Sequence, residues 1–209
     1  MSAPQPTEQS PGQTPGQTPG QTPSQTIGPY FSMILAHDEA EAVVAGPDVP
    51  GEHIVLVGRV LDGDGEAVED ALVELWQADP NGRYRHPLDT RTDPPLHPGF
   101  TGFGRTKSAF DSGTWSFTTV RPGSVPAADG TPQAPHLGLV VQARGMLDPV
   151  WTRAYLEDEA NTDDPVLAAL PEERRTTLVA RRDGEQDGLP RFRLDIHLQG
   201  EHETVFLDW

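Results

Sequence analysis

The segment APHLGLVVQAR, residues 134–144, has the alternation of a β-strand that is buried on one side. Leucine, leucine, valine and alanine occupy positions 137, 139, 141 and 143. Successive side chains of a strand point to opposite faces of a sheet, so these four share an apolar face. The opposite face carries His136, Gly138, Val140, Gln142 and Arg144. The segment therefore predicts a strand with polar groups at both ends of one face.

The spacing of His136 and Arg144 limits what the two side chains can do together. They are eight residues apart, about 26 Å at roughly 3.3 Å per strand residue. Unless the strand bends sharply, Arg144 cannot reach a pocket beside His136. We expect that Arg144 serves a pocket across an interface.

Short strands recur on both sides of this segment, separated by turns rich in Gly, Pro, Asp and Asn. Such a pattern predicts an all-β fold, a β-sandwich of mixed strands. Trp76 and Trp115 are centred in strands and are expected in the core. Strands are expected over residues 53–61, 71–78, 114–120, 137–143, 153–156 and 191–198, the last with alternating apolar residues on one face.

A short helical insertion is expected between the last strands. Asp164-Pro165 has the residue types of a helix N-cap and first helical position. A second short helix opens at residues 171–173, with acidic side chains near its positive end. Residues 178–179 are expected to provide its apolar contact, and the arginines at 181–182 to close it.

The N-terminal region differs in composition from the rest of the chain. From Pro11 it repeats Pro-Gly-Gln-Thr three times, and a fourth copy reads Pro-Ser-Gln-Thr. Without apolar side chains to bury, residues 1–26 are expected to form a disordered or extended arm, either a solvated extension or a strap over a neighbouring subunit. Residues 27–209 are expected to form the β-sandwich domain.

Charge and composition exclude several classes of function. Lys+Arg 15 against Asp+Glu 32 gives a formal net charge of −17, so neither nucleic acid nor an anionic membrane surface is an expected partner. The absence of cysteine excludes disulfides, thiolate nucleophiles and cysteine-ligated metals. No apolar run is long enough to cross a bilayer, and the N-terminus lacks the layout of a secretory signal. The expected location is the cytoplasm.

Several short motifs resemble the intradiol ring-cleavage dioxygenase family. The resemblance covers nearly everything from residue 25 to residue 209 and agrees with the β-sandwich expected above. It rests on Gly28-Pro29-Tyr30, Pro50-Gly51-Glu52-His53, Glu74-Leu75-Trp76-Gln77-Ala78, Gly104-Arg105, Arg121-Pro122-Gly123, Ala143-Arg144-Gly145 and Phe192-Arg193-Leu194-Asp195-Ile196.

The resemblance implies a metal site that is incomplete in this chain. Catalytic members of the family hold ferric iron through two tyrosinates and two histidines. The matching positions are Tyr84, Val125, His136 and Gly138, and the catalytic arginine matches Gln133. Valine and glycine offer no side-chain donor to a hard ion that favours anionic oxygen ligands. These five residues are therefore expected to form a vestigial pocket without iron.

The resemblance also implies a role in a larger assembly. Some members of the family combine an alpha chain with a homologous beta chain, which alone holds Fe(III), and the match is closest to the alpha chain. Gly28, Pro29, Tyr30 and Arg144 would then line the beta subunit's substrate pocket. The expected reaction of the αβ hetero-oligomer is intradiol cleavage of 3,4-dihydroxybenzoate by O2 to 3-carboxy-cis,cis-muconate. This chain alone would be inactive.

Two other functions remain open at this point. One is a self-sufficient, catechol-type intradiol dioxygenase with an altered metal site, in which His86 or His97 would supply a third ligand. The other is a non-enzymatic β-sandwich binding module. Iron and ring-cleaving activity in the chain purified alone would favour the first, and the absence of an iron-bearing relative on purification would favour the second.

Overall fold

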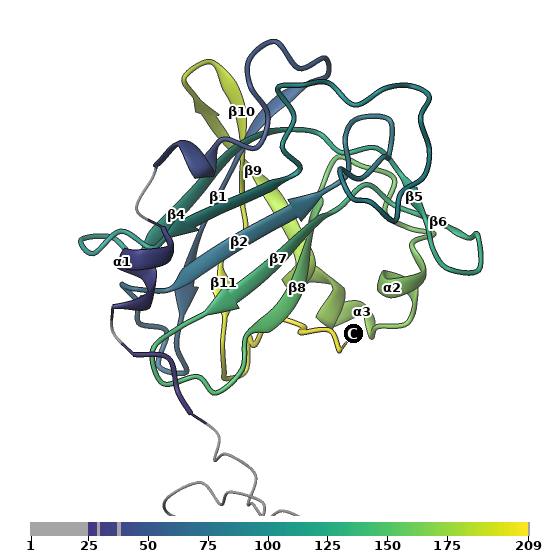
Figure 1. The fold of residues 1–209 in the computed structure, drawn as a ribbon. Coiled ribbons are helices and arrows are strands. Elements are labelled where there is room, and N and C mark those ends of the chain that lie inside the picture. The colour runs from purple at the N-terminus through teal and green to yellow at the C-terminus, as the bar shows by residue number, and fades with distance from the viewer. Residues whose placement is uncertain (1–24, 29, 37–38, 209) are drawn as a thin grey trace, which may run out of the picture.

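The computed structural model describes residues 25–28, 30–36 and 39–208, and its body is a sandwich of strands with short helices at the margins (Figure 1). The predicted arm, residues 1–26, lies almost entirely outside the described residues. The strands are β1 (His53–Leu61), β2 (Leu72–Gln77), β3 (Phe103–Lys107), β4 (Thr114–Val120), β5 (Val125–Pro126), β6 (Pro132–Gln133), β7 (Leu137–Gln142), β8 (Val150–Leu156), β9 (Val179–Gln186), β10 (Leu189–Arg193) and β11 (Ile196–His197).

Strand β1 lies at the centre of the hydrogen-bonding pattern. It pairs with β4 in antiparallel and with β10 and β11 in parallel orientation. From β10 the sheet continues through β9, β8, β7 and β2 to β3, and β8 and β9 are also parallel. The short hairpin of β5 and β6 stands apart from this sheet. The predicted all-β sandwich of mixed strands is confirmed.

The core between the layers is built from apolar side chains of nearly every long strand. Trp115 and Phe117 are almost fully buried, as predicted for Trp115. Gly58 lets the chain after β10 cross close to β1, because a Cβ there would lie 1.8 Å from the carbonyl oxygen of Leu194. The same crossing divides the single strand predicted over residues 191–198 into β10 and β11.

The helical insertion lies between β8 and β9 and consists of α2 (Pro165–Ala168), α3 (Glu172–Arg175) and the 3-10 helix η2 (Thr176–Leu178). Asp164 caps α2 as predicted: its carboxylate accepts hydrogen bonds from the backbone N–H groups of Val166 and Leu167. The prediction that residues 181–182 close a helix was wrong. Both belong to β9, because β8 and β10 supply backbone partners for this segment.

Two further features were not anticipated. Strand β3 lies outside all the predicted strands and pairs with β2. Trp76 was expected in the core, but 36% of its surface is exposed, so that prediction was wrong.

Near the N-terminus, α1 (Phe31–Leu35) and the 3-10 helix η1 (Glu39–Ala42) precede the first strand. No helix in the described part of the chain is long and apolar enough to cross a membrane.

Candidate functional site

A hollow of about 240 Å³ opens beside the start of β7, and we call it the Tyr84 hollow. Tyr84, His136 and Gly138 line it, together with Trp76 and other residues of β7 and β8. Val125, from the β5–β6 hairpin, lines an adjoining hollow that shares Trp76 and Tyr84. The fold thus brings four of the predicted pocket residues to one region, and Trp76 is exposed because it forms part of the wall.

The loop after β2 positions Tyr84. Asp79 accepts hydrogen bonds from the backbone N–H groups of Asn81 and Arg83, which fixes the turn, and Asp89 accepts one from the N–H of Tyr84 at 2.8 Å. The Tyr84 ring stacks on Trp76 with 6.3 Å between ring centroids. Burial raises the pKa of the Tyr84 hydroxyl, although nearby Arg153 opposes this shift. The phenol is therefore protonated at neutral pH.

His136 is buried, with only 5% of its surface exposed. Its Nδ1 atom lies 2.8 Å from the carbonyl oxygen of Ala134. Because a carbonyl only accepts, the neutral ring carries its proton on Nδ1 and its Nε2 is an acceptor. Burial, and next the charge of Arg153, lower the pKa of His136 to about 4. His136 is neutral at neutral pH.

Arg153 is the main residue of this region that was not predicted as part of the site. It lies directly across from Gly138 in the β7–β8 register and is 6% exposed. Its Nη1 donates to the side-chain oxygen of Gln133 at 2.7 Å and to the hydroxyl of Tyr155 at 3.2 Å. Alternation along β8 could have placed Arg153 and Tyr155 on one face, but the pairing with Gly138 depends on a register that only the folded sheet reveals.

Asp164 connects the helical insertion to this region. Its side chain is buried and accepts hydrogen bonds from the Tyr155 hydroxyl at 3.0 Å and from the backbone N–H of Ala134 at 2.9 Å, besides capping α2. Ala134 in turn holds the imidazole of His136 through its carbonyl. One carboxylate therefore fixes both the start of α2 and the segment that carries His136.

The residues around the Tyr84 hollow do not fit ferric iron. Tyr84 offers one phenol oxygen, His136 offers one imidazole nitrogen, and the positions of Val125 and Gly138 provide no donor. The guanidinium of Arg153 adds a fixed positive charge, which opposes a trivalent cation.

The alternative third ligands do not complete a metal site either. His86 lines the adjoining hollow, whereas His97 lies in a different one. Within the described residues, no group of three or more His, Asp or Glu side chains could hold a metal ion.

The second predicted cluster lies at the other end of β7. Pro29 is outside the described residues. Thr26 donates a hydrogen bond to the carbonyl of Met146 at 3.0 Å, which ties the segment before Gly28 to the loop after Arg144. Tyr30 is 68% exposed at the start of α1.

Arg144 is also exposed, and its Nε lies 3.1 Å from a carboxylate oxygen of Asp70. In Figure 1 the start of β7 lies toward β5 and β6, and its end points toward the N-terminal segment. Arg144 therefore lies away from His136, as the strand spacing predicted, and the contact of Thr26 with Met146 brings the segment before Gly28 to the Arg144 end of β7.

Similarity to known proteins shows the family of this chain. The Dioxygenase family profile matches residues 26–200, and the chain belongs to the intradiol ring-cleavage dioxygenase family. The chain is 44% identical over 196 residues, 88% of its length and 94% of the relative's, to the protocatechuate 3,4-dioxygenase alpha chain of Pseudomonas putida. It is 34% identical over 178 residues, 81% of this chain and 74% of the relative, to the protocatechuate 3,4-dioxygenase beta chain of Burkholderia cepacia.

Solved structures support the fold independently. Hydroxyquinol 1,2-dioxygenase from Pseudomonas putida DLL-E4 superposes with a TM-score of 0.60 at 18% identity, over 87% of this chain and 68% of that one. At this low sequence identity the superposition is evidence of the sandwich fold alone.

Proposed function

We propose that this chain is the non-catalytic alpha subunit of a heteromeric protocatechuate 3,4-dioxygenase. The observation that carries the proposal is the pairing of 44% identity to an alpha chain with an iron site that lacks two of its four donors. In this proposal a homologous beta subunit holds Fe(III), and this chain binds none. The bound iron would supply the activation of the catechol toward O2, and all ring-opening chemistry belongs to that partner.

The role proposed for this chain is to complete the partner's substrate pocket. Gly28, Pro29, Tyr30 and Arg144 would line the pocket that receives 3,4-dihydroxybenzoate. Arg144 suits the substrate carboxylate, because a guanidinium presents a planar fork of donors and stays charged. The contact with Asp70 engages Nε, and a guanidinium has five N–H donors in all. Tyr30 adds a flat apolar surface with a hydroxyl donor.

Exposure of these side chains supports an intermolecular role. Tyr30 is 68% exposed and the Arg144 side chain is 60% exposed, yet Asp70, which orients Arg144, is buried. A partner that covers this end of β7 would exclude water from the arginine and strengthen its attraction to a carboxylate. The expected product is 3-carboxy-cis,cis-muconate, formed with both oxygen atoms of O2.

The first experiment measures iron. The chain is expressed with and without the homologous beta subunit, and bound iron and the visible absorption of tyrosinate-bound Fe(III) are recorded. We expect iron and colour only in the pair, with one iron for each two chains. Tyr84→Phe and His136→Gln in this chain should leave the iron content of the pair unchanged. Two irons in each pair, with half of the iron lost in these variants, would mean that this chain binds iron, which is the self-sufficient alternative.

The second experiment measures substrate use by the pair. Arg144→Gln is expected to raise KM for 3,4-dihydroxybenzoate at least about tenfold, since a hydrogen bond to a charged group contributes about 1.5–3 kcal/mol. The control Arg174→Gln removes an arginine from α3 and should leave KM unchanged. If Arg144→Gln dissociates the pair without altering the KM of the remaining complex, the arginine holds the interface and does not bind the substrate.

A further inference from the structure

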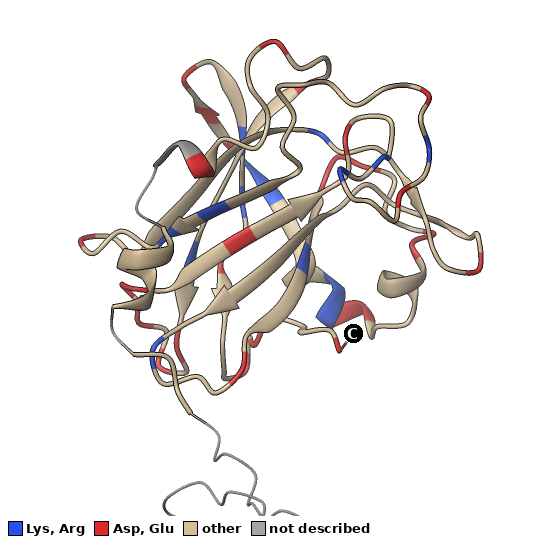
Figure 2. Cartoon of the chain, in the orientation of Figure 1, with Lys and Arg blue, Asp and Glu red and all other residues tan. Residues whose placement is uncertain are grey.

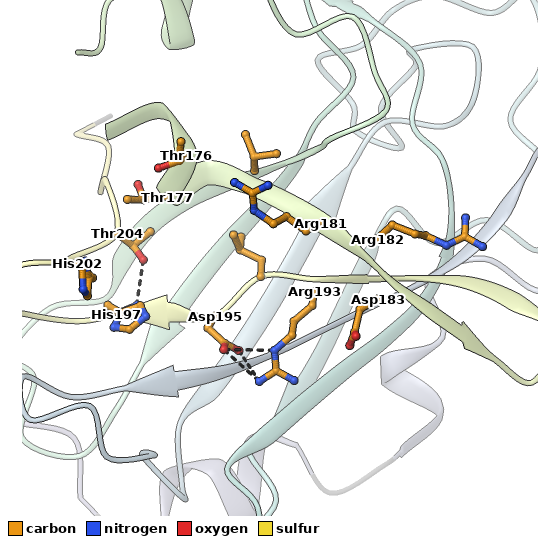
Figure 3. Close-up of a pocket in the computed structure, with 12 residues that line it drawn as sticks. Thr176, Thr177, Arg181, Arg182, Asp183, Arg193, Asp195, His197, His202 and Thr204 are labelled. Carbon is orange, nitrogen blue, oxygen red and sulfur yellow. Dashed lines mark hydrogen bonds and ion pairs between the residues drawn. The ribbon is translucent and has the colours of Figure 1, made fainter. Parts of the chain in front are cut away.

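Another hollow, of about 470 Å³, lies on the side of β9, β10 and β11 that faces away from the core. It shares no lining residue with the Tyr84 hollow. Figure 3 shows side chains from β9, from the chain around β10 and β11, and from the C-terminal turn around it. We call it the arginine hollow. Its polar lining consists of Thr176, Thr177, Arg181, Arg182, Asp183, Arg193, Asp195, His197, His202 and Thr204.

The strand register brings two arginines together in this hollow. Arg181 of β9 and Arg193 of β10 are directly opposite each other in an antiparallel pair. Like charges at such positions repel unless an anion compensates them. Arg193 is compensated by Asp195, with 2.9 Å between Nη2 and Oδ1. The ion-pair partner of Arg181 is Glu157 at 3.8 Å, and the arginine side chain is 66% exposed. Arg181 is thus the weakly compensated member of the pair.

The carboxylates in the wall of the hollow are already engaged. Asp195 also lies 3.7 Å from Nη2 of Arg59 and accepts its backbone N–H. Asp183 pairs with Arg191 at 3.0 Å. Neither carboxylate therefore neutralises Arg181. The lining thus holds three arginines and two aspartates, in a chain of net charge −17 whose acidic residues lie mostly in loops and turns (Figure 2).

Polar groups suited to an anion lie beside the arginines. Thr204 brings a hydroxyl, and the rings of His197 and His202 are 6.1 Å apart at the same end of the hollow. The Thr204 hydroxyl oxygen accepts the backbone N–H of His197, which leaves its proton available to a ligand. The hollow thus offers guanidinium, hydroxyl and imidazole groups around one space.

We propose that the arginine hollow binds a small organic anion with two or more carboxylate or phosphate groups. Guanidinium forks match both groups, and a ligand with several charges can meet Arg181 and reach the polar groups at the other end of the hollow. A volume of about 470 Å³ accommodates such a molecule rather than a single small ion. This site is separate from the proposed substrate pocket and stands or falls independently of it.

The test measures binding to the full-length chain, alone and in any complex that it forms. Citrate, a tricarboxylate, and fructose 1,6-bisphosphate, which has two phosphate groups, are titrated by calorimetry, with acetate and chloride at matched ionic strength as references. We expect saturable binding of at least one multivalent anion and none of acetate. The tighter of the two ligands identifies the charged group that the hollow selects. In NMR spectra the ring protons of His197 and His202 should shift with the same saturation curve.

Variants localise the site. Arg181→Gln is expected to weaken binding about tenfold, the loss of one charge-assisted hydrogen bond. Arg181→Lys keeps the charge and should lose less. Lys107→Gln is the matched control, because it also removes one positive charge but lies in β3, outside the hollow; its affinity should equal that of the wild type. Equal affinity in Arg181→Gln, or no saturable signal beyond chloride and acetate, would overturn the proposal.

Discussion

Lowering the pH should destabilise this chain through His136 in particular. Burial holds the pKa of His136 at about 4, below its ordinary value of 6.5. Between these values the unfolded chain binds a proton that the folded chain does not accept. The contribution of the neutral imidazole to the free energy of unfolding is therefore fully present above pH 6.5. It is lost progressively as the pH falls toward 4.

The expected size of the effect follows from linkage. With these two pKa values, the free energy of unfolding falls by about 2 kcal/mol between pH 7.5 and pH 5, and by about 3 kcal/mol once the pH is below 4. Carboxylates titrate in the same pH range, so the pH dependence of wild-type stability alone does not isolate the effect of His136. His136→Gln removes the titrating group and keeps a polar side chain, and its stability should depend less on pH by this amount.

The assay is urea denaturation followed by tryptophan fluorescence, at intervals from pH 7.5 to pH 5, for the wild type and His136→Gln. The variant is less stable than the wild type at pH 7.5 if Gln fills the site less well, and the difference should shrink or reverse by pH 5. Parallel curves for the two proteins, with a constant offset, would refute the reasoning, because they would mean that the buried ring titrates as in the unfolded chain.

Three further changes test the packing. Asp164→Ala should lower stability by about 3 kcal/mol, since it removes a helix cap and leaves buried donors unpaired, whereas exposed Asp163→Ala should have little effect in the same urea titration. Gly82→Ala should cost at least about 2 kcal/mol, because φ is +73° and the new Cβ would lie 1.9 Å from the Ser124 carbonyl oxygen; Tm measures the loss. Deletion of residues 1–24 should leave Tm unchanged. A marked drop in Tm would contradict the prediction of a disordered or extended arm.

Local sequence signals predicted the strands with strong boundaries. His53–Leu61 and Thr114–Val120 were both anticipated with the observed ends, because apolar runs there stop at glycine-containing or proline-containing turns. The N-cap of α2 was also predictable from the sequence, since Asp164 accepts hydrogen bonds from backbone N–H groups only two and three residues away. In each case the deciding interaction lies within a few residues along the chain.

Elements whose partners are distant in sequence were harder to predict. Val179–Gln186 has a charged composition and becomes β9 only because strands on both sides supply hydrogen bonds. Trp76 faces the Tyr84 hollow, not the core, and periodicity alone does not say which face of a strand is covered. Arg153 joined the site through its register with Gly138. The resemblance to a family predicted Tyr84 and His136 in one pocket, whereas the presence of Arg153 in the same hollow depends on how β7 and β8 pair in the folded sheet.

The placement of β10 and β11 alongside β1 has a consequence for synthesis of the chain. β1 begins at His53, and its parallel partners end at His197, so more than half of the polypeptide separates the two sides of this pairing. Long-range parallel pairing forms slowly, since the entropy of closing a large loop is lost before the contacts between the strands form. During translation one edge of β1 stays unpaired until the final segment leaves the ribosome. That edge is the place where a nascent chain of this protein is most exposed to aggregation or to capture by a chaperone.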